Sequence, residues 1–204
     1  MKFKNYLNED DSVISDIKRE CSKSLKIFKK SGIPFYRGVT YTFNVDYVKR
    51  SVRTNRKPRD MDVESQQVFD DIFQKRFGWK PRSQGLFCVA DPKIARDYGN
   101  VGVVIPCGDF KYLWNPDVED LFKGLSHKKT FWSPLKDTVS VIKMIFGKPY
   151  DTKEMIRQYT KGYKDNDIFL YFKKYPENEI MIQCKDYYVV SESYWNNTLK
   201  KELL

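Results

Sequence analysis

The sequence has almost no histidine, no paired cysteines and no long apolar run. Its single histidine, His127, excludes a His-rich metal centre and any mechanism that needs two imidazoles. The four cysteines (Cys21, Cys88, Cys107 and Cys184) form no Cys-x-x-Cys pair, so we expect buried reduced thiols and neither a zinc site nor a redox motif. No apolar run reaches the roughly 18 to 20 residues of a membrane span, and the charged start has no apolar signal core. We therefore expect a cytoplasmic protein with no membrane partner.

The common nucleotide-binding motifs are also missing. The chain contains neither Gly-x-Gly-x-x-Gly nor Gly-x-x-x-x-Gly-Lys, and its serines lack the context of a nucleophile elbow. The usual dinucleotide folds, phosphate-binding loops and serine hydrolases are therefore not indicated.

What the sequence does have is positive charge, with a net +10 that favours an acidic partner such as nucleic acid or an anionic cofactor. The charge is concentrated between Lys49 and Arg59, where six cations occur without one anion. Such a run repels itself unless something negative lies across it, and we expect it to form a loop that contacts an acidic partner.

Apolar periodicity and turn residues predict an α+β protein without alternating βαβ units. At 204 residues the chain is expected to form one domain, with an N-terminal helical segment (1–32), a core (33–190) and a C-terminal helix (191–204). The first helix is expected to be capped at Asp11-Ser12 and to end at Gly32. Further helices are expected over 63–77, 94–98, from Asn115-Pro116 through Phe122, and in pieces over 135–175; strands are expected over 35–39, 85–90, 101–106, 110–114, 180–184 and 187–190.

Three positions near predicted strands could carry chemistry. Arg37 follows apolar residues in a short strand, where a buried guanidinium needs an anionic partner and suits a pyrophosphate; Gly38 after it lets a ligand approach the backbone. Glu177 and Glu179 should point the same way on a strand, because the side-chain period is two, and their repulsion can raise one pKa. The third position is the segment Arg82 to Ala90.

Together, these segments resemble the Arg-Ser-Glu class of mono-ADP-ribosyltransferases, which includes arginine-modifying toxins and phage-encoded enzymes. The family pattern has an aromatic-Arg-Gly strand, then Gly-Phe-x-Ser-Thr-Ser before a helix with an Ala and an aromatic residue. It ends with Glu-x-Glu before an apolar strand, a turn and a strand ending in Val. The corresponding segments here are Phe35 to Gly38, Gly85 to Ala90 with Ala95 and Tyr98, and Glu177 to Val190.

The resemblance implies a split core of two small packed sheets that binds NAD⁺ without a metal. It implies that Arg37 binds the pyrophosphate, that the Gly38 backbone contacts the nicotinamide amide, and that Tyr98 belongs to the cofactor site. Glu179 would be the catalytic carboxylate, and Glu177 would orient or deprotonate the acceptor. The acceptor is expected to be an arginine of a host protein if the chain is phage-encoded. Where the family has Ser-Thr-Ser this chain has Cys88-Val89-Ala90, so either Ser83 or Cys88 could take the position of the middle serine.

Two other readings remain open. A transferase that modifies a nucleic-acid base would use the basic run, with Arg76, Lys80 and Arg82, as its substrate groove. A basic nucleic-acid-binding phage protein without catalysis would leave Arg37 and Glu179 unexplained.

Overall fold

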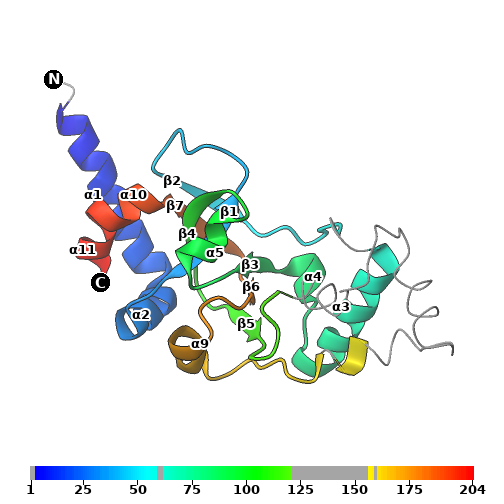
Figure 1. Ribbon diagram of the computed structural model, residues 1–204. Coiled ribbons are helices and arrows are strands. Elements are labelled where there is room, and N and C mark those ends of the chain that lie inside the picture. Colours follow the sequence, from blue (N-terminus) through cyan, green and yellow to red (C-terminus); the bar gives the residue numbers. More distant parts are fainter. Residues whose placement is uncertain (1–2, 59–61, 121–155, 159) are drawn as a thin grey trace, which may run out of the picture.

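The structure is a computed structural model that describes residues 3–58, 62–120, 156–158 and 160–204. The described part contains helices and two small antiparallel sheets, which confirms the predicted α+β class. One sheet has the strand order β1-β4-β7-β2 and the other has the order β3-β6-β5 (Figure 1). The strands are β1 (Phe35–Val39), β2 (Tyr47–Ser51), β3 (Leu86–Cys88), β4 (Asn100–Pro106), β5 (Lys111–Trp114), β6 (Ile180–Gln183) and β7 (Asp186–Ser191).

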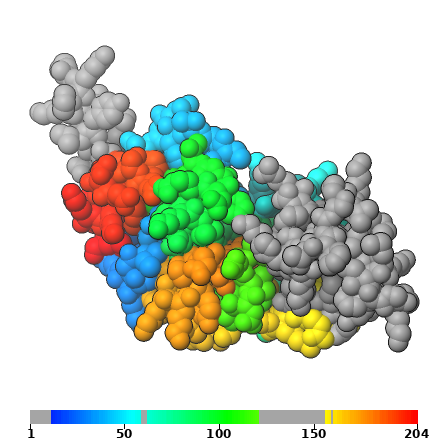
Figure 2. Space-filling view, viewed as in Figure 1, coloured from blue at the N-terminus to red at the C-terminus, as the bar shows by residue number. Residues whose placement is uncertain are grey.

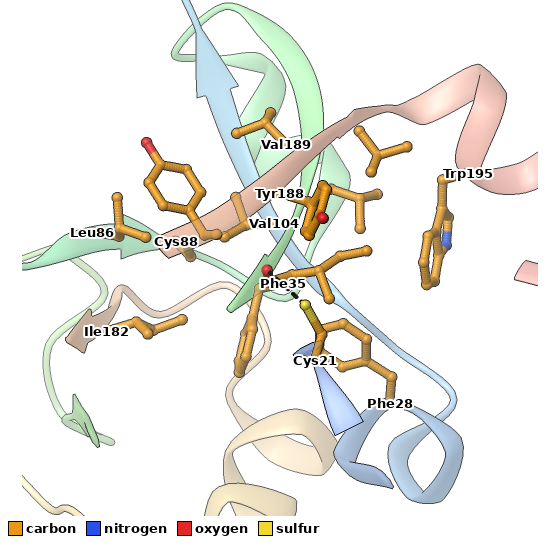
Figure 3. Close-up of a cluster of buried hydrophobic side chains, with 14 of the residues drawn as sticks. Cys21, Phe28, Phe35, Leu86, Cys88, Val104, Ile182, Tyr188, Val189 and Trp195 are labelled. Carbon is orange, nitrogen blue, oxygen red and sulfur yellow. Dashed lines mark hydrogen bonds between the residues drawn. The ribbon is translucent and has the colours of Figure 1, made fainter. Parts of the chain in front are cut away.

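Short turns pass the chain from one sheet to the other, so both sheets share one core. The turn at Gly108 leads from β4 in the larger sheet to β5 in the smaller one, and the turn at Lys185 leads from β6 to β7. Figure 3 shows the resulting cluster of buried side chains. Its members come from the four-stranded sheet, the three-stranded sheet and the terminal helices, and include Phe35, Val104, Val189, Leu86, Cys88, Ile182, Phe28 and Trp195.

The two faces of the three-stranded sheet pack against different partners. Ile180 and Ile182 of β6 enter the shared core, whereas Met181 enters a second cluster with Phe69 and Phe73 of α3 (Val63–Phe77). The alternation follows from the strand period of two. It places α3, and α4 (Pro81–Gln84) after it, on the side of the sheet to which odd-numbered residues of β6 point.

Helices from the two ends of the chain pack together beside the larger sheet (Figures 1 and 2). The ring of Phe28 meets the ring of Trp195 edge to face, with centroids 6.2 Å apart. These helices are α1 (Phe3–Glu20), α2 (Ser22–Ser31), α10 (Glu192–Tyr194), a π-helical segment (Trp195–Leu199) and α11 (Lys200–Leu203). The remaining helices are α5 (Pro92–Arg96) and α9 (Ile168–Lys174). No helix in the described ranges is both long and apolar enough to cross a bilayer.

Several sequence predictions about elements need correction. The N-terminal helix begins well before the expected cap at Asp11-Ser12 and is broken at Cys21, which separates α1 from α2. The basic segment is not all loop, because β2 pairs with β7 and includes Lys49 and Arg50. Residues 115–120 form turns and bends rather than the start of a helix. Phe122, His127 and the expected helical pieces up to residue 155 lie outside the described residues.

Candidate active site

Glu179 stands at the start of β6, on a turn whose backbone is tied to its surroundings. Its own N–H donates to the carbonyl of Glu119 over 2.6 Å. The buried amide of Asn178 donates to the carbonyls of Asn115 and Pro116 at 2.8 and 3.2 Å, while the Tyr171 hydroxyl donates to the Asn178 carbonyl at 3.0 Å. Because each neighbouring peptide group is bonded, the position of the Glu179 backbone is fixed by the fold.

Glu177 is more exposed than Glu179, and the expectation that the two carboxylates lie along one strand is wrong. The strand begins only at Ile180, and Glu177 sits exposed in the preceding turn. The carbonyl of Pro176 in this turn accepts the N–H groups of Ala90 and Asp91 at 2.7 and 2.9 Å. The turn is therefore attached to the end of β3, with Glu177 on its solvent side.

The Glu179 carboxyl group is largely removed from water. Its side chain is 14% exposed, and Oε1 lies 3.7 Å from Nη1 of Arg82. Within the described residues Oε1 is buried and has no hydrogen-bond donor. Burial raises the pKa of Glu179 to about 7, with Asp120 acting in the same direction and Arg82, Arg56 and Arg37 opposing it. A carboxyl group that titrates near neutrality suits either charge stabilisation or proton transfer.

Arg82 reaches this carboxylate from α4, which α3 holds in place. Asp70, buried on α3, accepts the Arg82 N–H at 2.8 Å and also accepts a short hydrogen bond from the Ser83 hydroxyl. The guanidinium carbon of Arg82 lies 4.7 Å from the ring centroid of Phe87, and that of Arg56 lies 4.2 Å from the same ring. A cationic and aromatic cluster thus borders Glu179.

The structure separates the two candidates for the middle serine. The Ser83 hydroxyl is engaged by Asp70 and also accepts from the Gln66 amide at 3.3 Å. Cys88 is buried on β3 and pairs with Ile180, the residue after Glu179. Burial raises the pKa of its thiol to about 12, and the charges of both Arg37 and Glu179 act on it. The Cys88 thiol thus lies close enough to both Arg37 and Glu179 to feel their charges, whereas the Ser83 hydroxyl is bonded to α3.

Arg37 lies near Cys88 and Glu179 because β1, which carries it, forms a single β-bridge with Val89, the residue after β3. Tyr36 and Val89 exchange two backbone hydrogen bonds, of 2.7 and 2.9 Å. The Arg37 side chain is half-buried, and within the described residues no side chain forms an ion pair or hydrogen bond with its guanidinium. A half-buried cation of this kind is suited to an anionic ligand.

Gly38 and Tyr98 meet at the back of β1. A Cβ atom on Gly38 would lie 2.4 Å from the Ala95 carbonyl oxygen and 2.6 Å from Tyr98 atoms. The space that a side chain at position 38 would need is thus filled by the chain around α5, which explains the glycine by packing; the expected contact of its backbone with a ligand stays a prediction. Tyr98, 47% exposed, donates from its hydroxyl to Asp120 at 2.8 Å.

Comparison with known proteins gives no family. No protein-family model matches this chain. No curated protein and no solved structure is detectably similar to it either. Within the ranges that the structure describes, no three His, Cys, Asp or Glu side chains gather as metal ligands would.

A surface pocket of about 290 Å³ lies at the opposite end of β6 from Glu179. Its walls come from β2, α4 and the turn after β6, through Ser51, Val52, Thr54, Gln84, Gln183, Cys184 and Lys185. None of the predicted site residues lines it, so the pocket does not bear on the chemistry of Glu179.

The basic run is divided among several roles. Lys49 forms an ion pair of 2.5 Å with Glu20, and Arg50 lies over the ring of Tyr41. Arg53 and Lys57 are exposed, while Arg56 lies against Phe87 near Glu179. Glu20 thus neutralises one cation of the run, and Arg56 lies at the border of the site; an acidic partner for the rest stays a prediction.

Proposed function

We propose that this chain is a mono-ADP-ribosyltransferase that uses NAD⁺ as co-substrate. The observation that carries the proposal is the placement of Arg37, Cys88 and Glu179, which the sequence motifs singled out, on or beside neighbouring strands. Support for the fit of NAD⁺ comes from two groups: the Arg37 guanidinium and the buried Glu179 Oε1, which within the described residues has no hydrogen-bond donor.

In this proposal Arg37 binds the pyrophosphate through its planar guanidinium. NAD⁺ supplies an activated ribosyl carbon: its bond to nicotinamide breaks, nicotinamide leaves as a neutral molecule, and the acceptor nitrogen bonds to the same carbon and loses a proton. The ionised Glu179 carboxylate stabilises the positive charge that develops on the ribose. A carboxylate held by a bonded backbone makes this contribution without rearrangement.

An arginine side chain is the acceptor that the acidic rim favours. Glu177 is exposed two residues before Glu179, and Asp120 raises the pKa of Glu179. A guanidinium that approaches from this rim meets negative charge, which steers it and can activate it. Glu177 is the residue we assign to this role.

The second candidate acceptor is nucleic acid, which exposed cations on the segment before Arg56 favour. Arg53 and Lys57 are exposed cations on the segment that leads to Arg56 and Phe87. Such a track could bind phosphates, and its affinity would then fall steeply with salt. The carboxylates Glu177 and Asp120 thus favour an arginine acceptor, whereas the exposed cations Arg53 and Lys57 favour nucleic acid.

The test is incubation of the purified chain with labelled NAD⁺ and three acceptors: agmatine as a free guanidine, cell lysate, and polynucleotide. Labelled agmatine and protease-sensitive lysate label, both reduced by Glu177→Gln, would support an arginine acceptor. Nuclease-sensitive label that Glu177→Gln leaves unchanged would support nucleic acid. Glu179→Gln is the inactive control in every arm. Nucleic-acid binding with no label and no released nicotinamide would instead leave a non-catalytic binding protein.

A further inference from the structure

The ion pair between Arg82 and Glu179 is closely shielded from water. The Arg82 side chain is 13% exposed and the Glu179 side chain 14%, whereas both partners of the Arg96–Glu192 pair are much more open to water. Two charges removed from water in this way depend on each other, since each would be costly to bury alone. Removal of one should therefore be felt directly by the other.

The surroundings of Arg82 hold its guanidinium in place. Its backbone N–H is fixed by the buried Asp70 carboxylate, and the Phe87 ring supports the guanidinium. Phe87 lies on β3, opposite Met181 of β6, so the support stands on the same pair of strands that carries Glu179 at its edge. These contacts fix both ends of the arginine side chain.

We infer that Arg82 is a positioning residue for Glu179, whose guanidinium, 3.7 Å from Oε1, favours the charged form of the Glu179 carboxylate. The role fits the absence of a hydroxyl from Cys88-Val89-Ala90 on β3. A buried carboxylate that loses its nearby cation keeps its proton to a higher pH, so a smaller fraction of it is charged at neutral pH. The consequence for catalysis rests on the proposed function, but the effect on the Glu179 carboxylate does not.

Arg82 is the first of several charged or titratable groups that face Glu179. Burial is the main cause that raises the pKa of Glu179, and among the cations Arg82 opposes it most. The other groups that act on Glu179, or on which it acts, are Asp120, Arg56, Arg37, Cys88, Tyr98, Tyr163 and Tyr171. Because Arg56 and Arg37 remain in an Arg82 variant, the effect of Arg82 is measurable as a shift rather than a complete loss of ionisation.

The test is titration of the Glu179 carboxyl carbon by NMR in protein labelled with ¹³C-glutamate, with the signal assigned by its absence from Glu179→Gln. In the wild type the midpoint is expected at about pH 7. Arg82→Met should move it upward by about one pH unit, since an opposite charge within ~4–6 Å commonly moves a carboxyl pKa by one to three units. Arg82→Lys should keep most of the wild-type midpoint because it keeps the charge.

The matched control is Arg96→Met, which removes an equal charge from the Glu192 pair and should leave the Glu179 midpoint unchanged. If Arg82→Met does not fold, Arg82→Gln is titrated in its place. An unchanged midpoint in the folded neutral variant would overturn the inference, as would an equal shift in Arg96→Met. In an active protein, the pH profile of nicotinamide release should move with the midpoint. A wild type that cleaves no NAD⁺ would defeat the proposed function, while the titration would still decide the role of Arg82.

Discussion

Replacement of Glu179 by Gln should make the protein gain stability, relative to the wild type, as the pH rises through neutrality. Burial raises the pKa of Glu179 from an ordinary 4.5 to about 7, so the folded protein holds a proton there more tightly than the unfolded chain. This contribution to stability is fully present below about pH 4.5 and is lost as the pH rises through 7. The native fold therefore keeps this carboxyl group at an energetic cost whenever it is ionised.

The size of the effect follows from the difference between the two pKa values. About 2.5 units at roughly 1.4 kcal/mol each give about 3 kcal/mol between the low-pH and high-pH limits. Glutamine has a similar shape and no titration, so its other effects on stability add the same offset at every pH. The difference in unfolding free energy, Gln variant minus wild type, should thus rise by about 3 kcal/mol from pH 4 to pH 9.

The assay is urea unfolding of both proteins at pH intervals across this range. All other titrating groups are shared, so their contributions cancel to a first approximation in the difference. Arg82→Lys in the wild-type background, which keeps the positive charge opposite Glu179, should leave the pH dependence close to that of the wild type. A difference that stays flat to within about 0.5 kcal/mol, or that falls as the pH rises, would refute the reasoning. The result bears on the burial of Glu179 whatever reaction the protein catalyses.

Three further predictions concern the framework of the site. Asn178→Ala removes two buried hydrogen bonds to backbone carbonyls and should destabilise the protein by about 1–3 kcal/mol in urea unfolding; an unchanged stability would contradict the role given to the turn. Gly38→Ala places a Cβ 2.4 Å from the Ala95 carbonyl oxygen, so amide exchange over residues 92–98 should become faster; unchanged exchange would show that the space is not filled. The Cys21 and Cys107 sulfurs lie 3.3 Å apart, so one equivalent of dilute hydrogen peroxide should oxidise the two thiols to a disulfide, with two waters formed. Peptide mapping that finds both thiols free after this treatment would refute the prediction.

The parts of the fold that the sequence predicted well are those with strong local signals. The helix over Val63–Phe77 is bounded by the Asp62 cap and by Gly78, whose φ of 78° suits glycine. The strand Phe35–Val39 follows Pro34 directly and is confirmed residue by residue. Both predictions depend on residues that influence the backbone conformation only a few positions along the chain.

Pairing between distant segments was not predictable from such signals. Nothing local shows that α4 reaches the start of β6, so the Arg82–Glu179 ion pair and the anchoring role of Asp70 were missed. Asp70 is a carboxylate beside Phe69 and Phe73 on the buried side of α3, a signal that could have marked it as a partner of backbone or hydroxyl donors.

The candidate site was predicted in part. Position along the motifs was enough to select Arg37 and Glu179, which the fold places near Cys88. The choice between Ser83 and Cys88 needed the β3–β6 register, and the orientation of Glu177 depended on where β6 begins. The break of the first helix at Cys21 likewise depends on packing against β4: just after the break, the Ser24 hydroxyl donates a hydrogen bond to the carbonyl of Pro106 in β4.

The central claim is that Glu179 belongs to an NAD⁺-cleaving site, and the most direct test is nicotinamide release by the purified chain. Wild type and Glu179→Gln are incubated with NAD⁺ at pH 8, and nicotinamide is quantified by chromatography. We expect release by the wild type and a rate at least about 100-fold lower for the variant, in line with the loss of a transition-state charge partner. Because the variant is expected to gain stability with rising pH relative to the wild type, unfolding would not explain its loss. Equal rates from the two proteins, or no release from a folded wild type, would contradict the claim.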